Sequence, residues 1–187
     1  MKARTLVRGV LGIAAALALS APAEAQLFRA YLAVDGNDAN PCTLPQPCRL
    51  LPAALAAVAD GGEIWMLDSA NYNTATVQVT KSVTMLAVPG VVGSVVAAYG
   101  PAINVATAGV RLALRNLVMV PLAGTGGVRG ISMNLGQSLA VEDCLIANMP
   151  NLGIEVVGPV SVSISGTTIR DNASMGVSLH GGARASI

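Results

Sequence analysis

The chain has 187 residues, enough for one domain, and charged residues make up 11% of it, against about 25% in typical soluble domains. Hydrophobic residues reach 53%, yet aromatic residues are only 3%, and there are 3 cysteines. This composition excludes a disordered chain, a nucleic-acid-binding protein and a disulfide-dense mini-protein, because the first two need charge and the third needs more cysteines.

Residues 1–25 have the pattern of a secretory signal peptide. A basic start is followed by an apolar run at 10–19 and by Ala23-Glu24-Ala25, which predicts cleavage after Ala25. The alternative is an uncleaved anchor, but the run is shorter than the roughly 20 residues of a membrane span. Cleavage removes three basic residues and one acid, leaving 8 basic and 9 acidic residues. We therefore expect an exported protein of the periplasm, the cell surface or the extracellular space, without a basic surface for nucleic acid.

Residues 26–62 are predicted to form an N-terminal cap. Because exported proteins meet oxidising conditions, we predict a disulfide between Cys42 and Cys48, which lie in a Pro-containing loop. Metal binding is the rival for this pair, but no His or third thiol lies nearby, so no metal site is predicted. Cys144 is left over, and we expect a buried free thiol. The Ala-rich segment 49–60 predicts an amphipathic helix, ended by Gly61-Gly62, that covers the open end of the following fold.

The segment 35–40, rich in Asp and Asn, is superficially similar to the start of a calcium-binding loop. The EF-hand pattern fails at Ala39, Asn40 and Gln46, where that loop has other residues. We therefore expect a turn and no cofactor, with a Ca²⁺ site of another kind as the alternative.

The segment 63–187 contains an internal repeat. Residues 139–158 align with residues 162–181 at an offset of 23 without a gap, and residues 130–133 precede residues 153–156 by the same offset. Earlier units fit with offsets of 27 and 28. Each unit consists of short strands of alternating polarity separated by Gly, Asn or Asp turns.

Alternation within the repeated strands separates a buried face from an exposed one. The inward positions are Ile131, Ile154 and Val177, and the outward positions are Ser132, Glu155 and Ser178. One unit cannot bury its apolar face alone, but units stacked about 4.8 Å apart can. The pattern therefore predicts an all-β solenoid, a parallel β-helix of about 23 residues per coil.

Residues 82–110 carry no charged residue, which raises the alternative of a membrane span. Pro and Gly interrupt the segment repeatedly, and its apolar residues are largely β-branched, which indicates buried strands and turns. We expect no transmembrane span after residue 25.

The 23-residue coil, the Gly-Ile-x-Val strands and the Asn or Asp turn residues resemble the right-handed parallel β-helix, or pectin-lyase-like, superfamily of exported bacterial type. The turn residues are Asn116, Asp143, Asn148, Asp171 and Asn172. The resemblance implies a right-handed β-helix with an N-terminal capping helix. Enzymes of this fold usually cleave acidic polysaccharides, although the fold hosts many functions.

The last residue, Ile187, falls in mid-strand at the position equivalent to Ile164. Because solenoids need atypical terminal repeats, this position suggests that the C-terminal end is truncated and the chain a fragment. The alternative is a true end that is covered by end-to-end self-association.

Candidate catalytic carboxylates are few. From Val77 onward the only acids are Glu142, Asp143, Glu155 and Asp171, and they occupy four different positions of the repeat. The motifs of polygalacturonases and pectate lyases are absent, so no catalytic residue is assigned. Glu142 lies one coil from Arg115, which predicts a surface ion pair. The candidate polar surface consists of Glu142, Asp143, Glu155, Arg170 and Asp171.

Aromatic residues could mark a glycan-binding surface. They end at Tyr99, so the later coils offer no aromatic platform. Trp65 either faces outward or packs beneath the N-terminal cap, and we expect the second. His180, the only histidine, is expected to point outward at a turn.

Two functions fit these residues. The first is a non-catalytic module at the cell surface, adhesin-like or structural, that presents the loops 121–129, 148–152 and 171–175 to an extracellular polysaccharide or cell-surface component. The second is a polysaccharide lyase or glycoside hydrolase whose catalytic coils lie beyond Ile187. The sequence favours the first.

Overall fold

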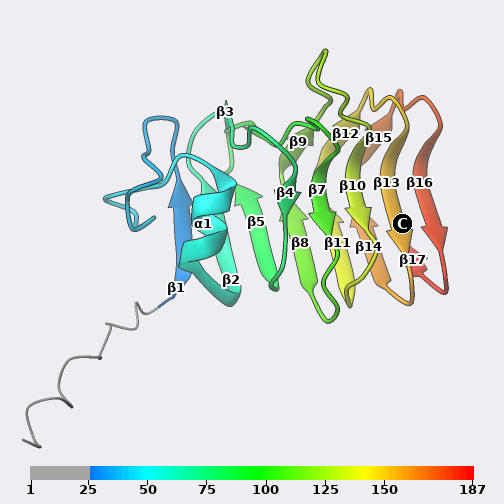
Figure 1. Ribbon diagram of the computed structural model, residues 1–187, viewed down its shortest axis with the longest axis horizontal. Helices are drawn as coiled ribbons and strands as arrows, with labels where there is room; N and C mark the ends of the chain where they lie inside the picture. Colours follow the sequence, from blue (N-terminus) through cyan, green and yellow to red (C-terminus); the bar gives the residue numbers. More distant parts are fainter. Residues whose placement is uncertain (1–25) are drawn as a thin grey trace, which may run out of the picture.

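The computed structural model describes residues 26–187, so the predicted signal peptide lies outside the described residues. The chain winds into a parallel β-solenoid of about five turns, with about 23 residues per turn and one short helix beside the first strands (Figure 1). The predicted all-β fold, a parallel β-helix, is therefore confirmed. Among residues 26–187 no helix has the length and hydropathy needed to cross a membrane.

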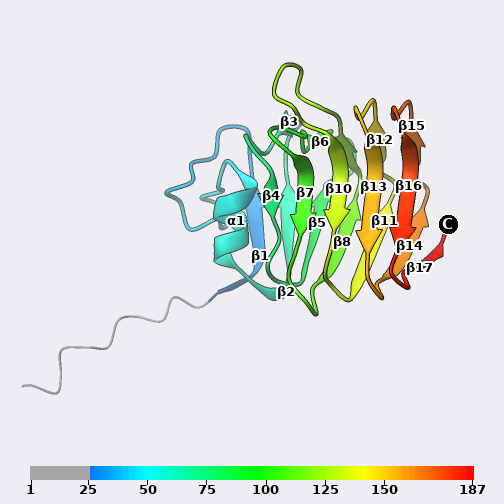
Figure 2. The same ribbon diagram turned by 45° about the vertical axis from the view of Figure 1, so that its right-hand side comes forward.

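Three parallel sheets form the walls of the solenoid (Figure 2). The first runs in the order β1 (Leu27–Leu32), β2 (Val58–Met66), β5 (Val83–Ala87), β8 (Arg111–Arg115), β11 (Ser138–Glu142), β14 (Ser161–Ser165) and β17 (Arg184–Ser186). The second contains β4 (Val77–Gln78), β7 (Pro101–Val105), β10 (Arg129–Met133), β13 (Leu152–Val157) and β16 (Met175–His180). The third contains β3 (Ala70–Asn71), β6 (Gly93–Ser94), β9 (Leu117–Met119), β12 (Leu145–Ala147) and β15 (Thr168–Arg170).

The predicted register of the repeat is confirmed. Ile131 pairs with Ile154, and Ile154 pairs with Val177, on neighbouring strands of the second sheet. Ile131 and Ile154 are fully buried, while Val177 is partly buried against the same core. The longer offsets also hold, since Leu112 pairs with Leu139 on β8 and β11. Insertions therefore bulge out between strands and leave the stacked core positions aligned.

A ladder of glycines lets the coils approach closely at the start of the second-sheet strands. A Cβ added at Gly130 would lie 2.6 Å from the carbonyl oxygen of Gly153, and one at Gly153 would lie 2.5 Å from that of Gly176. Since no real Cβ atom fits at these distances, the repeated Gly before the inward Ile or Val is a packing requirement.

The turns between the first and third sheets use a left-handed residue. Asn116, Asp143 and Gly166 have φ values of 54°, 53° and 57° at equivalent positions of successive coils. Asn and Asp tolerate this conformation better than other non-Gly residues. The same need explains Asn148 and Asp171, with φ values of 61° and 56°, after the third-sheet strands.

The N-terminal cap contains the predicted disulfide between Cys42 and Cys48. The helix predicted over 49–60 is shorter than expected, because α1 spans Leu51–Ala57 and the chain enters β2 at Val58. Val58 pairs with Leu27 of β1 and is fully buried, so its place in the core ends the helix before Gly61-Gly62. Leu51, Ala54 and Leu55 form the buried face of α1, which covers the end of the core.

Candidate functional site

The structure disperses the five predicted site residues over different surfaces. Glu142 ends β11 on the outer face of the first sheet, and its Oε2 lies 2.8 Å from Nε of Arg115 in the preceding coil. The predicted surface ion pair is confirmed. Asp143 follows in the left-handed turn, whereas Arg170 and Asp171 contact each other at the end of β15. Both members of that second pair are more than half exposed.

Glu155 lies on the second sheet, away from the other carboxylates. Its Oε2 is 3.3 Å from Nε of Arg129 and 3.3 Å from Oγ of Ser132, which pairs with it on β10. Ser132 and the other register partner, Ser178, are each only 5% exposed, although the alternation placed both on the exposed face. Ser178 makes a 2.7 Å hydrogen bond with Nε2 of His180, whose side chain is exposed as expected. Each of these polar side chains is engaged by a neighbour.

Trp65 contradicts the expectation that it packs beneath the cap. It alternates with the buried Ile64 and Met66 on β2, so its half-buried ring lies on the outer face of the first sheet. Tyr31 is its partner on β1, and the two ring centroids are 6.3 Å apart at 68°. The alternation could have placed both rings outside, because inward positions of β1 and β2 are apolar.

Arg29 and Glu63 hold the two rings in place. The Arg29 guanidinium lies 3.9 Å from the Trp65 ring centroid, a cation–π contact. Oε2 of Glu63 accepts hydrogen bonds from Arg29 Nε at 2.8 Å and from Trp65 Nε1 at 3.0 Å. The hydrogen bonds to Glu63, and then to Tyr31, raise the pKa of Arg29. The sequence did not indicate this cluster, since its members come from two non-repeating strands.

A row of side chains continues from these rings across the first sheet. In register, successive strands place Tyr31, Trp65, Leu86, Arg115 and Glu142 side by side, and we call this set the aromatic row. Beside its middle lies a hollow of about 480 Å³, which we call the row hollow. The hollow is lined by Leu86, Ala87, Pro89, Gly90, Arg115, Asn116 and Asp143. The row and its hollow therefore join aromatic, apolar and polar groups on one face.

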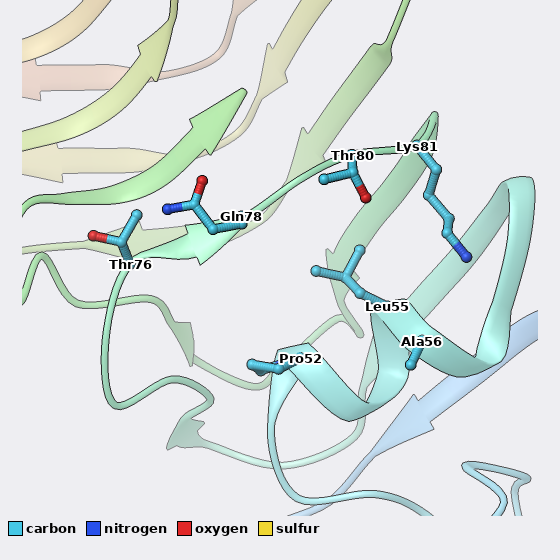
Figure 3. A pocket seen from close by; sticks show the side chains of 7 residues that line it. All are labelled: Pro52, Leu55, Ala56, Thr76, Gln78, Thr80 and Lys81. Atoms are coloured by element: carbon cyan, nitrogen blue, oxygen red, sulfur yellow. The ribbon is translucent and has the colours of Figure 1, made fainter. Parts of the chain in front are cut away.

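A second groove, of about 340 Å³, separates α1 from β4 (Figure 3). Pro52, Leu55 and Ala56 form its helical wall, and Thr76, Gln78 and Thr80 line the opposite side. Lys81, at one end, donates a hydrogen bond from Nζ to the carbonyl oxygen of Val58 at 2.8 Å. Because β4 is an edge strand of the second sheet, the helix shields an edge that would otherwise meet water.

The Asp-rich segment 35–40 has a structural use. Oδ1 of Asp38 accepts hydrogen bonds from the backbone N–H groups of Arg49 and Leu50, each at 2.8 Å, just before α1. Asn37 caps its own turn through the N–H of Ala39 at 2.9 Å. Among residues 26–187, no three His, Cys, Asp or Glu side chains gather as a metal site would need.

Cys144 is a buried free thiol, as expected. Its Sγ accepts a hydrogen bond from the N–H of Leu117 at 3.4 Å. Burial raises the pKa of Cys144 to about 11. The thiol therefore stays protonated at neutral pH, which leaves it a core residue without the thiolate that nucleophilic chemistry needs.

Raising the pH should consequently destabilise the fold through Cys144. The folded state binds this proton more tightly than the unfolded chain, whose thiol has a pKa of about 9, so stability falls between about pH 9 and 11. Urea unfolding at several pH values, compared with Cys144→Ala, isolates the effect, since the raised pKa of Tyr72 is common to both proteins. Equal pH dependence in the two proteins would contradict this assignment.

No family model matches the chain, and searches of curated proteins and of solved structures also give no match.

Proposed function

We propose that the protein is an exported, non-catalytic module of the pectin-lyase-like type that acts at the cell surface as an adhesin-like or structural component. Its partner is an extracellular polysaccharide or another cell-surface component. The observation that carries this proposal is the aromatic row, an outward-facing set of side chains in register across five strands of one sheet. Such a surface suits attachment to an extended partner.

The engagement of the acidic side chains supports a binding role over catalysis. Glu142, Glu155 and Asp171 each contact a separate arginine, and they lie on or beside three different sheets. Glycoside hydrolysis requires two carboxylates flanking one bond, roughly 5 to 10 Å apart.

The proposal is tested by asking whether the protein binds cell-envelope material and whether it cleaves polysaccharide. The full chain, exported by its own leader and labelled with a fluorophore, is expected to sediment with cell-envelope material. It should release no reducing ends or unsaturated sugars from polygalacturonate. Turnover that is lost in Glu142→Gln or Glu155→Gln would overturn the proposal in favour of a lyase or hydrolase. Failure to sediment with any envelope fraction would also count against it.

A further inference from the structure

We infer that the aromatic row and its hollow form a binding site for a neutral polysaccharide chain. This inference rests on the proposed function and specifies its site and ligand. The chain would lie across the strands of the first sheet, with pyranose rings against Tyr31 and Trp65 and hydroxyl groups in the row hollow.

The aromatic part of the site is rigid before any ligand arrives. Trp65 is fixed through Nε1 by Glu63 and through one ring face by Arg29, and Tyr31 meets it edge to face. The side chains of Arg29 and Glu63 are 35% and 28% exposed, so their polar atoms reach the solvent beside the rings. Sugar rings present apolar C–H faces and polar rims. A pre-ordered aromatic surface edged by donors and acceptors matches both, at little entropic cost.

The charges of the site favour a neutral ligand. Arg29 is paired with Glu63 and Arg115 with Glu142, and Asp143 adds one further carboxylate at the hollow. The other arginine on β8, Arg111, lies at the far end of that strand and donates to the side chain of Gln137 at 2.9 Å. The site therefore has no unpaired cation for an acidic sugar and a slight negative excess that would repel one.

The spacing of the row suits an extended chain. The members of the aromatic row come from consecutive strands, which lie about 4.8 Å apart. Extended chains of β-1,4-linked pyranose rings repeat at nearly this spacing, so one ring can follow each strand. The row hollow, at about 480 Å³, is within the size of ordinary ligand pockets and offers the Asp143 carboxylate and the Arg115 guanidinium to hydroxyl groups.

Trp65 is the only tryptophan of the chain, so its fluorescence reports on the site directly. Cellohexaose, the probe, is expected to shift the emission of the full chain in a saturable way. Roughly 0.5 M NaCl should leave the affinity unchanged, because a neutral ligand is not screened. Tyr31→Ala should weaken binding about tenfold. Tyr99→Ala, which removes a ring that is 76% exposed elsewhere, should change it less than about twofold.

The variant Asp143→Asn distinguishes the binding of a neutral ligand from the binding of an acidic one. It should keep the fold, since Asn116 adopts the same left-handed turn one coil earlier. For cellohexaose the variant should weaken binding about threefold, because a charged acceptor becomes neutral. A salt-sensitive response to polygalacturonate alone, strengthened by Asp143→Asn, would overturn the neutral assignment. An unchanged Trp65 emission with both probes, in a protein that still sediments with envelope material, would overturn this site while leaving the proposed function standing. Failure to sediment, together with an unchanged Trp65 emission, would overturn both.

Discussion

Ile154→Asp is expected to prevent the solenoid from folding. Ile154 is fully buried and lies in register between Ile131 and Val177, so the carboxylate would have apolar neighbours above and below. Burying an unpaired charge costs more than the 5–15 kcal/mol or so that stabilises a typical domain, or forces the coils apart. Far-UV circular dichroism of the purified variant should lack the β-sheet signal of the parent protein.

Val157→Asp is the matched control for this prediction. Val157 lies three residues further along the same strand, pairs with His180 and is 36% exposed. The same chemical change there should alter stability by about 0.5 kcal/mol or less. A folded Ile154→Asp protein with the urea midpoint of the parent would show that the position is not in the core.

The internal repeat allowed the fold of residues 63–187 to be predicted from the sequence. In a parallel solenoid, equivalent residues of successive units stack directly, so an offset of 23 predicts contacts as well as strands. The offset of 23 predicts the column at Ile154, and the earlier offset of 27 predicts the ion pair between Arg115 and Glu142. The repeat also showed that the acids occupy different positions of the repeat, so that stacking alone brings no two of them together.

The N-terminal region was harder to predict because it does not repeat. The end of α1 is decided by the burial of Val58 against β1, a contact between segments about 30 residues apart that no local propensity encodes. Trp65 faces outward because it alternates with the buried Ile64 and Met66, which the sequence pattern could have indicated, but the pairing of β2 with β1 beside it could not be predicted from a repeat. The candidate site depends on this pairing, which brings Arg29 and Tyr31 beside Glu63 and Trp65.

Asn73 has a structural role that its residue type does not indicate. Asn is typical of turns, and several asparagines of this chain occupy them. Asn73 instead is 1% exposed and bridges two coils, because its Oδ1 accepts from the N–H of Val96 at 2.8 Å and its Nδ2 donates to the Val96 carbonyl at 2.8 Å. Nδ2 also donates to the carbonyl oxygen of Ala75 at 2.8 Å. The side-chain amide of Asn73 thus makes the hydrogen bonds to the Val96 backbone that a neighbouring strand would otherwise make, at a position where no strand pairing forms.

Asn73→Ala is expected to destabilise the protein by about 3 kcal/mol, because the buried N–H and C=O groups of Val96 would lose their partner. The thermal midpoint should fall by roughly 10 °C. Asn104→Ala makes the same chemical change at an exposed side chain whose amide bonds only Gln78, so it should cost about 0.5 kcal/mol or less. Equal costs for the two variants in urea unfolding would contradict a bridging role for Asn73. The larger cost expected at Asn73 follows from burial, since the groups it leaves unpaired cannot turn to water.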